Sequence, residues 1–111
     1  MSWRIVPTLL LLSGSVLCGT AQPLAYAGPA VATKWRTNGE AQNICLGHAQ
    51  ETLRRNGFEP LGPGSQSMMG KRGEYTASIR CVPERQIVFF VMSGPSPAEA
   101  NRLLDSVFRG F

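Results

Sequence analysis

The sequence predicts a small, single α+β domain: an antiparallel β-meander of about three to four strands, with two helices packed on one face and one disulfide. Two amphipathic helical patterns, near 41–55 and 97–108, bracket a region of strand-like alternation between 67 and 92. Runs of strands bracketed by helices are typical of α+β domains. The third observation is a pair of cysteines, Cys45 and Cys81, that falls on these elements.

The N-terminal segment has the three parts of a secretory signal peptide. Arg4 supplies a positive charge, residues 5–17 are largely apolar, and Ala25-Tyr26-Ala27 is a small-residue cleavage site. We therefore expect a signal peptide over 1–27, a single domain over 28–111, and a periplasmic or secreted location; cleavage after Ala21 is an alternative. The apolar stretch is shorter than the about 20 residues of a spanning helix. We expect no transmembrane segment after cleavage.

The first helix is predicted from apolar side chains that recur every four residues. Thr37 and Glu40 have the spacing of a capping box, and Asn38 is an alternative cap. Gly57 follows the pattern and fits the left-handed residue that often ends a helix. The predicted buried stripe consists of Ala41, Cys45, Ala49 and Leu53.

Strands are predicted on both sides of this helix. Lys34-Trp35-Arg36 fits a short edge strand, whereas the prolines and glycines of 58–66 predict a surface loop. A short strand at 67–69 is expected to turn at 70–73 into a strand over 74–82. Residues 86–92 are apolar on both faces and predict a central strand. Within 74–82, one face is formed by Tyr75, Ala77, Ile79 and Cys81, and the other by Thr76, Ser78 and Arg80.

The last helix has the clearest start signal in the chain. Ser96 fits an N-cap, Pro97 the first helical position, and Glu99 a capping-box partner. The side chains that follow have the three-and-four spacing of one buried face. They are Ala100, Leu103, Leu104, Val107 and Phe108.

Cys45 and Cys81 are predicted to form a disulfide. Cys18 lies in the predicted signal peptide, and bulky Leu17 before it argues against lipid attachment, so an even pair remains for an oxidising compartment. Cys45 lies on the helix stripe and Cys81 on the buried strand face. The bridge should therefore fix the first helix to the sheet and contribute about 3–4 kcal/mol.

Catalytic chemistry finds little support in the sequence. His48 is the only histidine, and no nucleophile or orienting carboxylate is evident beside it. The cysteines lack the short spacing of zinc ligands, and the Gly64–Arg72 stretch departs from a phosphate-binding loop in its spacing and its final residue. We expect no metal and no cofactor.

A basic surface is the main candidate for binding. Residues 28–111 contain ten Lys or Arg and seven Asp or Glu, a surplus too small to favour nucleic acid. The expected partner is a protein or an anionic envelope component, and the cations proposed for it are Lys71, Arg72, Arg80 and Arg85. Met68, Met69, Trp35 and Tyr75 fit the core better than an exposed patch.

The function favoured by these observations is a non-enzymatic binding or interaction module outside the cytoplasm. Its expected contact surfaces are the 58–66 loop, the 70–73 turn and the sheet face opposite the helices. On that face, Thr76, Ser78 and Arg80 are expected beside Val88, Phe90 and Met92. The alternative is a small envelope enzyme or redox protein that uses His48 or the cysteine pair.

The intact mass of the protein, purified from the cell that exports it, should equal that of residues 28–111 minus two hydrogen atoms. Signal cleavage sets the first residue, and oxidation of Cys45 and Cys81 removes the hydrogens. A mass that includes residues 1–27 would contradict the signal peptide. A mass without the hydrogen loss would contradict the disulfide.

Overall fold

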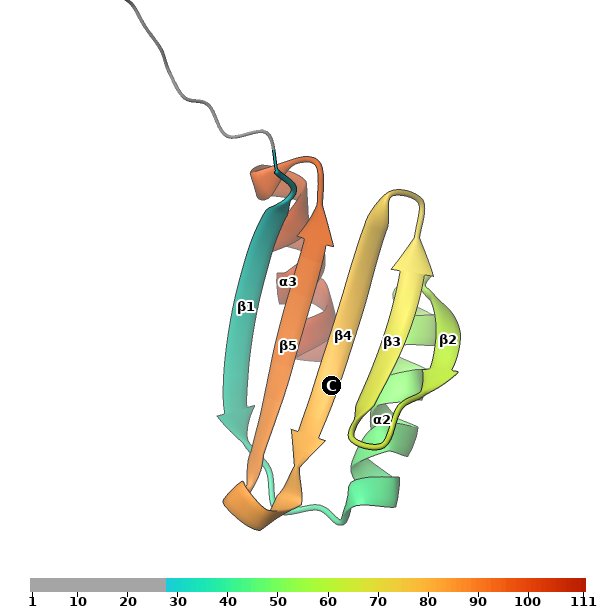
Figure 1. Cartoon of the computed structure of the whole chain (residues 1–111), viewed down its shortest axis with the longest axis vertical. Coiled ribbons are helices and arrows are strands. Elements are labelled where there is room, and N and C mark those ends of the chain that lie inside the picture. Colours follow the sequence, from blue (N-terminus) through green and yellow to red (C-terminus); the bar gives the residue numbers. More distant parts are fainter. Residues whose placement is uncertain (1–27) are drawn as a thin grey trace, which may run out of the picture.

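The computed structural model describes residues 28–111, which form one antiparallel sheet with two helices on one of its faces (Figure 1). The signal peptide predicted over 1–27 lies outside the described residues. The α+β class and the disulfide are confirmed, with five strands rather than three to four. The elements are β1 (Ala30–Thr37), α2 (Gln42–Arg55), β2 (Glu59–Pro63), β3 (Ser67–Arg72), β4 (Tyr75–Val82), the short helix η3 (Pro83–Arg85), β5 (Ile87–Gly94) and α3 (Pro97–Gly110). No helix within 28–111 is long and apolar enough to cross a membrane.

The sheet has the strand order β1-β5-β4-β3-β2. Strands β2 to β5 follow one another as a meander, and β1 pairs antiparallel with the last strand, from Ala30 opposite Gly94 to Thr37 opposite Ile87. Helix α2 lies against β2, β3 and β4, and α3 lies against β1 and β5. Helices α2 and α3 are both behind the sheet in Figure 1, so among residues 28–111 no helix covers the other sheet face.

The hydrophobic core fills the space between the sheet and the helices. The predicted faces of β4 and α3 both point to the core. Ala77, Ile79 and Cys81 are buried, as are four of the five predicted α3 residues, while Tyr75 and Phe108 are partly buried against the core. Removal of this apolar surface from water is the main stabilising contribution. The buried apolar residues are Ala32, Cys45, Ala49, Leu53, Phe58, Met68, Ala77, Ile79, Cys81, Val88, Phe90, Met92, Ala100, Leu103, Leu104 and Val107.

The start of α2 differs from the prediction. The capping box is wrong, because the helix begins at Gln42 with Ala41 as N-cap and has no side-chain cap. The polar residues before it shape the turn instead: Asn38 Oδ1 accepts a hydrogen bond from the Glu40 amide at 2.8 Å. Such side-chain bonds to nearby backbone groups compete with helix capping. The end of the helix is as predicted, with Gly57 at φ 81°.

Residues 59–63 form strand β2, so the loop predicted for 58–66 is wrong over that range. Proline is tolerated here because β2 is an edge strand, where an absent N–H need not break a ladder. Strand β3 also runs further than expected, to Arg72, and the chain turns at Gly73 with φ 59°. Gly70 therefore lies within β3, where an added Cβ would come within 3.1 Å of Leu53 and Phe58.

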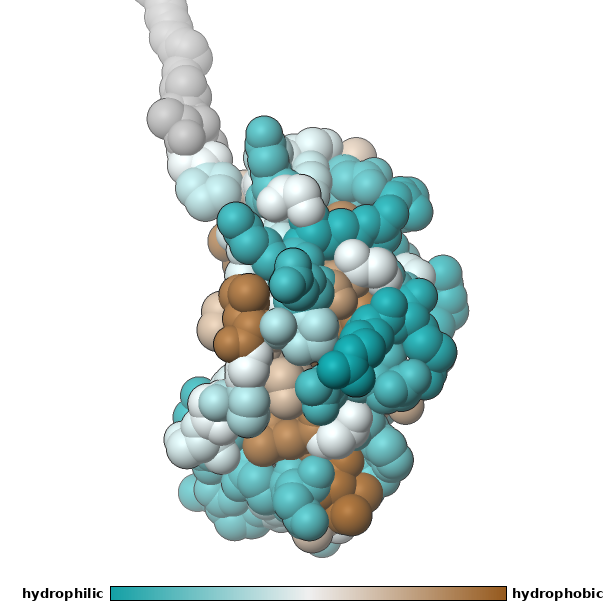
Figure 2. All heavy atoms as spheres, turned by 90° about the vertical axis from the view of Figure 1, so that its right-hand side faces the viewer, coloured by the Kyte–Doolittle hydropathy of each residue, from teal (hydrophilic) through white to brown (hydrophobic). Residues whose placement is uncertain are grey.

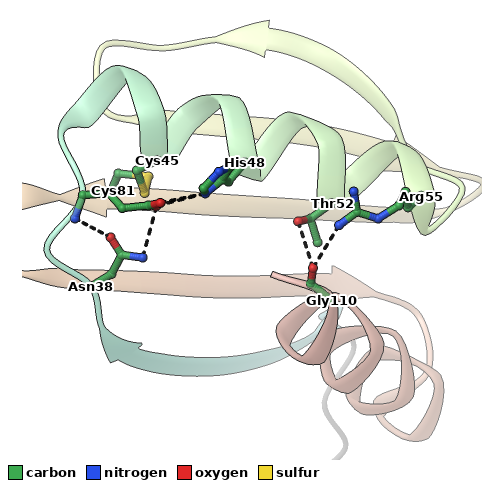
Figure 3. A network of polar contacts seen from close by, with 8 residues as sticks. Asn38, Cys45, His48, Thr52, Arg55, Cys81 and Gly110 are labelled. Carbon is green, nitrogen blue, oxygen red and sulfur yellow. Dashed lines mark hydrogen bonds and ion pairs between the residues drawn. A yellow bond between two sulfur atoms is a disulfide. The ribbon is translucent and has the colours of Figure 1, made fainter.

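Helix α3 is held at both ends by side chains. Ser96 Oγ accepts a hydrogen bond from the Glu99 amide at 3.3 Å, which confirms the predicted N-cap. At the other end, the last carbonyls of a helix have no partner within it. The Gly110 carbonyl accepts bonds from Thr52 at 3.4 Å and Arg55 at 3.1 Å, both on α2 (Figure 3). The guanidinium of Arg36 on β1 donates to the Phe108 carbonyl.

Replacement of Gly94 by alanine should lower the free energy of unfolding by about 3 kcal/mol, the upper part of the usual range for overpacking. A Cβ at Gly94 would lie 2.1 Å from the Tyr75 ring, whose hydroxyl accepts a hydrogen bond from the Ser96 amide and is therefore held in place. Urea unfolding measures the change.

The matched control is Gly47→Ala on the exposed side of α2, where a Cβ meets nothing within 4 Å. This variant should be more stable, by up to about 1 kcal/mol, because alanine favours the helix. Equal effects of the two substitutions would contradict the close packing of Tyr75 against Gly94.

Candidate functional site

The sheet face opposite the helices, which we call the open face, is the candidate functional site. Strand pairing arranges its side chains in rows that run across β1, β5, β4 and β3. Directly opposite residues in antiparallel strands point to the same face and lie about 5 Å apart. The rows are Trp35-Phe89-Arg80-Ser67, Thr33-Val91-Ser78-Met69 and Val31-Ser93-Thr76-Lys71.

The prediction of which β5 side chains share this face was wrong. Val88, Phe90 and Met92 are buried under the helices, with exposed fractions of 1%, 0% and 0%. Strand β5 is apolar on both faces, so its sequence alone did not show which of its two sets of alternate side chains faces the helices. The pairing of Cys81 with Val88 decides it, since Cys81 points to α2 through the disulfide. Phe89 and Val91 therefore lie beside Arg80 and Ser78.

Large apolar side chains are exposed on the open face. Trp35 is 58% exposed and Phe89 41%, and they are direct neighbours across β1 and β5. Arg80 follows as the next residue in the same row, so two aromatic rings and a cation form a line across three strands. Val31 and Met69 are also exposed, at 63% and 40%. Exposed apolar side chains gathered on one face of a folded domain are typical of interaction surfaces.

The core placement predicted for four apolar residues holds only in part. Met68 is 3% exposed and belongs to the core, and Tyr75 packs against the core while its hydroxyl bonds to the Ser96 amide. Met69 and Trp35 lie instead on the open face. The reason for the split is the strand alternation, which sends Met68 and Met69 to opposite faces of β3.

The four cations proposed as a binding surface lie in three places. Arg80 and Lys71 are on the open face, although Lys71 is opposite Thr76, four positions from Arg80 along β4. Arg72 alternates to the helix side, where its guanidinium donates to the Asn56 carbonyl at 3.0 Å. Arg85 lies in η3 at the end of the sheet. A binding role for these residues stays a prediction, and only Arg80 lies within the line of aromatic side chains.

His48 has the carboxylate partner that the sequence did not reveal. Its Nδ1 atom lies 2.9 Å from Glu40 Oε2, and the side-chain amide of Asn38 donates a hydrogen bond to Glu40 Oε1 at 3.3 Å (Figure 3). His48 borders a hollow of about 290 Å³ whose other lining residues include Arg55 and Phe111, whereas Glu40 does not line it. Among the described residues, no Ser, Thr or Cys side chain is hydrogen bonded to the His48 ring. The arrangement orients an imidazole but supplies no nucleophile next to it.

The disulfide between Cys45 and Cys81 is a structural bridge rather than an exposed reactive pair. The sulfur atoms are 2.03 Å apart, the Cα atoms 6.2 Å, and both residues are 1% exposed. Reactive cysteines are usually accessible. Within residues 28–111, no group of three or more His, Cys, Asp or Glu side chains is placed to hold a metal ion.

Comparison of this chain with protein-family models, with curated proteins and with solved structures finds no match. The function of the open face is therefore argued from its own geometry and chemistry.

The adjacent residues Phe89 and Phe90 should respond very differently to truncation. Phe90→Ala removes a ring that packs edge-to-face against Phe108 and Phe111, with centroids 5.1 and 5.3 Å away, and should cost about 3–5 kcal/mol of unfolding free energy. Phe89→Ala is a surface change and should cost less than about 1 kcal/mol. Urea unfolding compares the two variants. A larger loss of unfolding free energy in Phe89→Ala than in Phe90→Ala would contradict the burial of Phe90 and the exposure of Phe89.

Proposed function

We propose that this protein is a non-enzymatic binding module, exported to the periplasm or the cell exterior, that binds a protein partner through its open face. The observation that carries this proposal is the row Trp35-Phe89-Arg80 on a sheet face that neither helix covers. Burial of these side chains against a partner would remove from water the apolar surface that folding leaves exposed.

The composition of the open face favours a protein over a membrane as the partner. Aromatic residues, methionine and arginine are enriched at protein interfaces, and the open face has all three in Trp35, Phe89, Met69 and Arg80. Anionic membranes are usually recognised by clusters of about 4–8 Lys or Arg. The open face carries Arg80 and Lys71 in separate rows, which is a weak attraction for a lipid surface.

Arg80 indicates the chemistry of the partner surface. Arg80 is exposed, and its guanidinium donates to the amide oxygen of Gln66 at 2.6 Å. A partner carboxylate could pair with the remaining donors of this guanidinium. We therefore infer a partner surface with an apolar strip for Trp35 and Phe89 and an Asp or Glu beside it. The neighbouring residue Cys81 is bonded to α2, so the strand that carries Arg80 is fixed before binding, which lowers the entropic cost of association.

The alternative is an enzyme that uses the pair of Glu40 and His48. The 2.9 Å contact between them favours it, since a carboxylate that orients an imidazole is one part of a general-base site. His48 is bonded to no hydroxyl or thiol of residues 28–111. Such a site would therefore need a nucleophile that enters together with the substrate, such as a water molecule. For the redox version, burial of both sulfur atoms argues against exchange with a substrate.

A photo-cross-linking residue (p-benzoylphenylalanine) at Phe89 should capture a defined protein partner in the producing cell, and one at Ile44 should not. Ile44 is 49% exposed but lies on α2, away from the open face. Purified partner should then bind Arg80→Glu at least about tenfold more weakly, because charge reversal removes an ion pair and adds repulsion.

The charge-matched control is Arg54→Glu on the exposed side of α2, which should bind the partner normally. Equal cross-linking from Phe89 and Ile44, or equal affinity of Arg80→Glu and the parent protein, would contradict the proposal. Binding to vesicles of phosphatidylglycerol that Arg80→Glu abolishes, without a protein cross-link, would replace the protein partner by a lipid surface. A loss of cellular function in His48→Ala alone would favour the enzyme.

A further inference from the structure

Within residues 28–111, the two edge strands of the sheet differ in how well they protect their unpaired backbone groups. Strand β2, at one edge, is five residues long and contains Pro60 and Pro63, which have no N–H to donate. Its pairing with β3 shifts register between these prolines, and Gly62 has φ 95°. Short length, proline and bulges are the usual devices that prevent an edge strand from pairing further. The side of the molecule that bears this edge is mostly hydrophilic, with a few separate hydrophobic patches (Figure 2).

Strand β1, at the other edge, has none of these devices. It runs for eight residues without proline or glycine, and its pairing with β5 is continuous from Ala30 to Thr37. Val31 and Trp35, which point to the open face, are 63% and 58% exposed. A long and regular edge strand with exposed apolar side chains is a template for another strand.

The charged residue in the middle of β1 does not protect the edge. A lysine often prevents edge pairing because its charge would be buried. Here the Lys34 amine is drawn to the helix side, 2.8 Å from Asp105 Oδ1 and 5.0 Å from the centre of the Phe108 ring. The hydrogen bond from Lys34 lowers the pKa of the Asp105 carboxyl. The ion pair between these two side chains satisfies the lysine charge within one copy of the chain.

We infer that β1 pairs with β1 of a second copy, antiparallel and centred on Thr33, to form a dimer with one continuous sheet. A two-fold axis perpendicular to the sheet keeps the helices of both copies on the same side and places one residue opposite itself. This inference does not require the partner proposed for the open face, because the two strands pair through the backbone groups of the sheet edge, although Trp35 contributes to both surfaces.

The side chains of β1 select the register. With Thr33 opposite Thr33, Val31 of each copy lies opposite Trp35 of the other, and Lys34 lies opposite Ala32. A β-branched residue opposite an aromatic one is a favourable cross-strand pair. A register centred on Lys34 would place like charges opposite each other, which is destabilising. A register centred on Ala32 would leave Trp35 beyond the paired strand, since β1 begins at Ala30.

Helix α3 does not obstruct this pairing. It lies over β1 and β5 rather than beyond the edge. Neighbouring strands are about 5 Å apart, so a helix above the β1–β5 boundary would lie about 10 Å from its copy across the two-fold axis, the upper end of the usual separation of packed helices. The dimer would therefore bring the two α3 helices into contact as well, and would join the open faces of both copies into one surface.

Cysteine cross-linking tests the register. In Thr33→Cys, the two introduced thiols face each other across the axis, within the about 4–7 Å Cα separation of a disulfide, and mild oxidation should give a covalent dimer. The matched control is Val31→Cys, on the same strand and face, whose copy lies four positions away, about 13 Å; it should stay monomeric under denaturing, non-reducing conditions. The native disulfide is buried and should not exchange.

Sedimentation equilibrium tests the dimer without any new thiol. The protein, in the form recovered from its producing cell, should dimerise reversibly, and Thr33→Arg should raise the dissociation constant at least about tenfold because two charges meet on the axis. Leu61→Arg, at the exposed β2 edge, should leave it unchanged. Thermal melts of each variant confirm that the fold is intact.

A monomer at millimolar concentration would overturn the inference. So would a dimer that Leu61→Arg disrupts and Thr33→Arg does not. A dimer in which Val31→Cys cross-links and Thr33→Cys does not would overturn the Thr33-centred pairing.

Discussion

The disulfide between Cys45 and Cys81 is the contact on which the arrangement of the sheet depends. It joins the first helix to the middle strand of the sheet, and so decides which face of β4 is buried. Strand pairing then determines which side chains of β5 are buried. Val88 is opposite Cys81, so Val88 and every second residue of β5 point to the helix side. The composition of the open face follows from the same constraint, because the residues between the buried ones must point to the opposite face of the sheet.

The sequence predicted those elements whose signals are local. The alternation of β4 and the start of α3 are encoded within a few residues, as Ser96 and Pro97 illustrate, and both were confirmed. Strand β2 was missed because proline and glycine argue against a strand in general, whereas an edge strand tolerates them. The helix cap was misplaced because Asn38 and Glu40 bond to each other instead of to the first turn of α2. Local signals therefore misled where a partner elsewhere in the fold, or a competing local bond, decided the outcome.

The candidate site could be predicted only in part, for a related reason. Arg80 was expected on the sheet face opposite the helices, and it is there, but its aromatic neighbours were not foreseen. Phe89 was missed because both faces of β5 are apolar, and Trp35 because its place beside Phe89 depends on pairing between the first and last strands. The link between Glu40 and His48 likewise needs the turn before α2. Residues that contact each other through tertiary structure leave no periodic trace in the sequence.

The pairing of β1 with β5 also bears on the order in which the chain can fold. Ala30 is opposite Gly94, and the last turn of α3 is bonded to Arg36, Thr52 and Arg55 from the first half of the domain. Contacts of such long sequence separation slow folding, because the intervening chain must close before they form. During synthesis from the N-terminus, β1 has no partner until nearly the whole domain exists. Strand β1 therefore joins the sheet late in synthesis, whereas α2 and strands β2 to β4 can associate earlier.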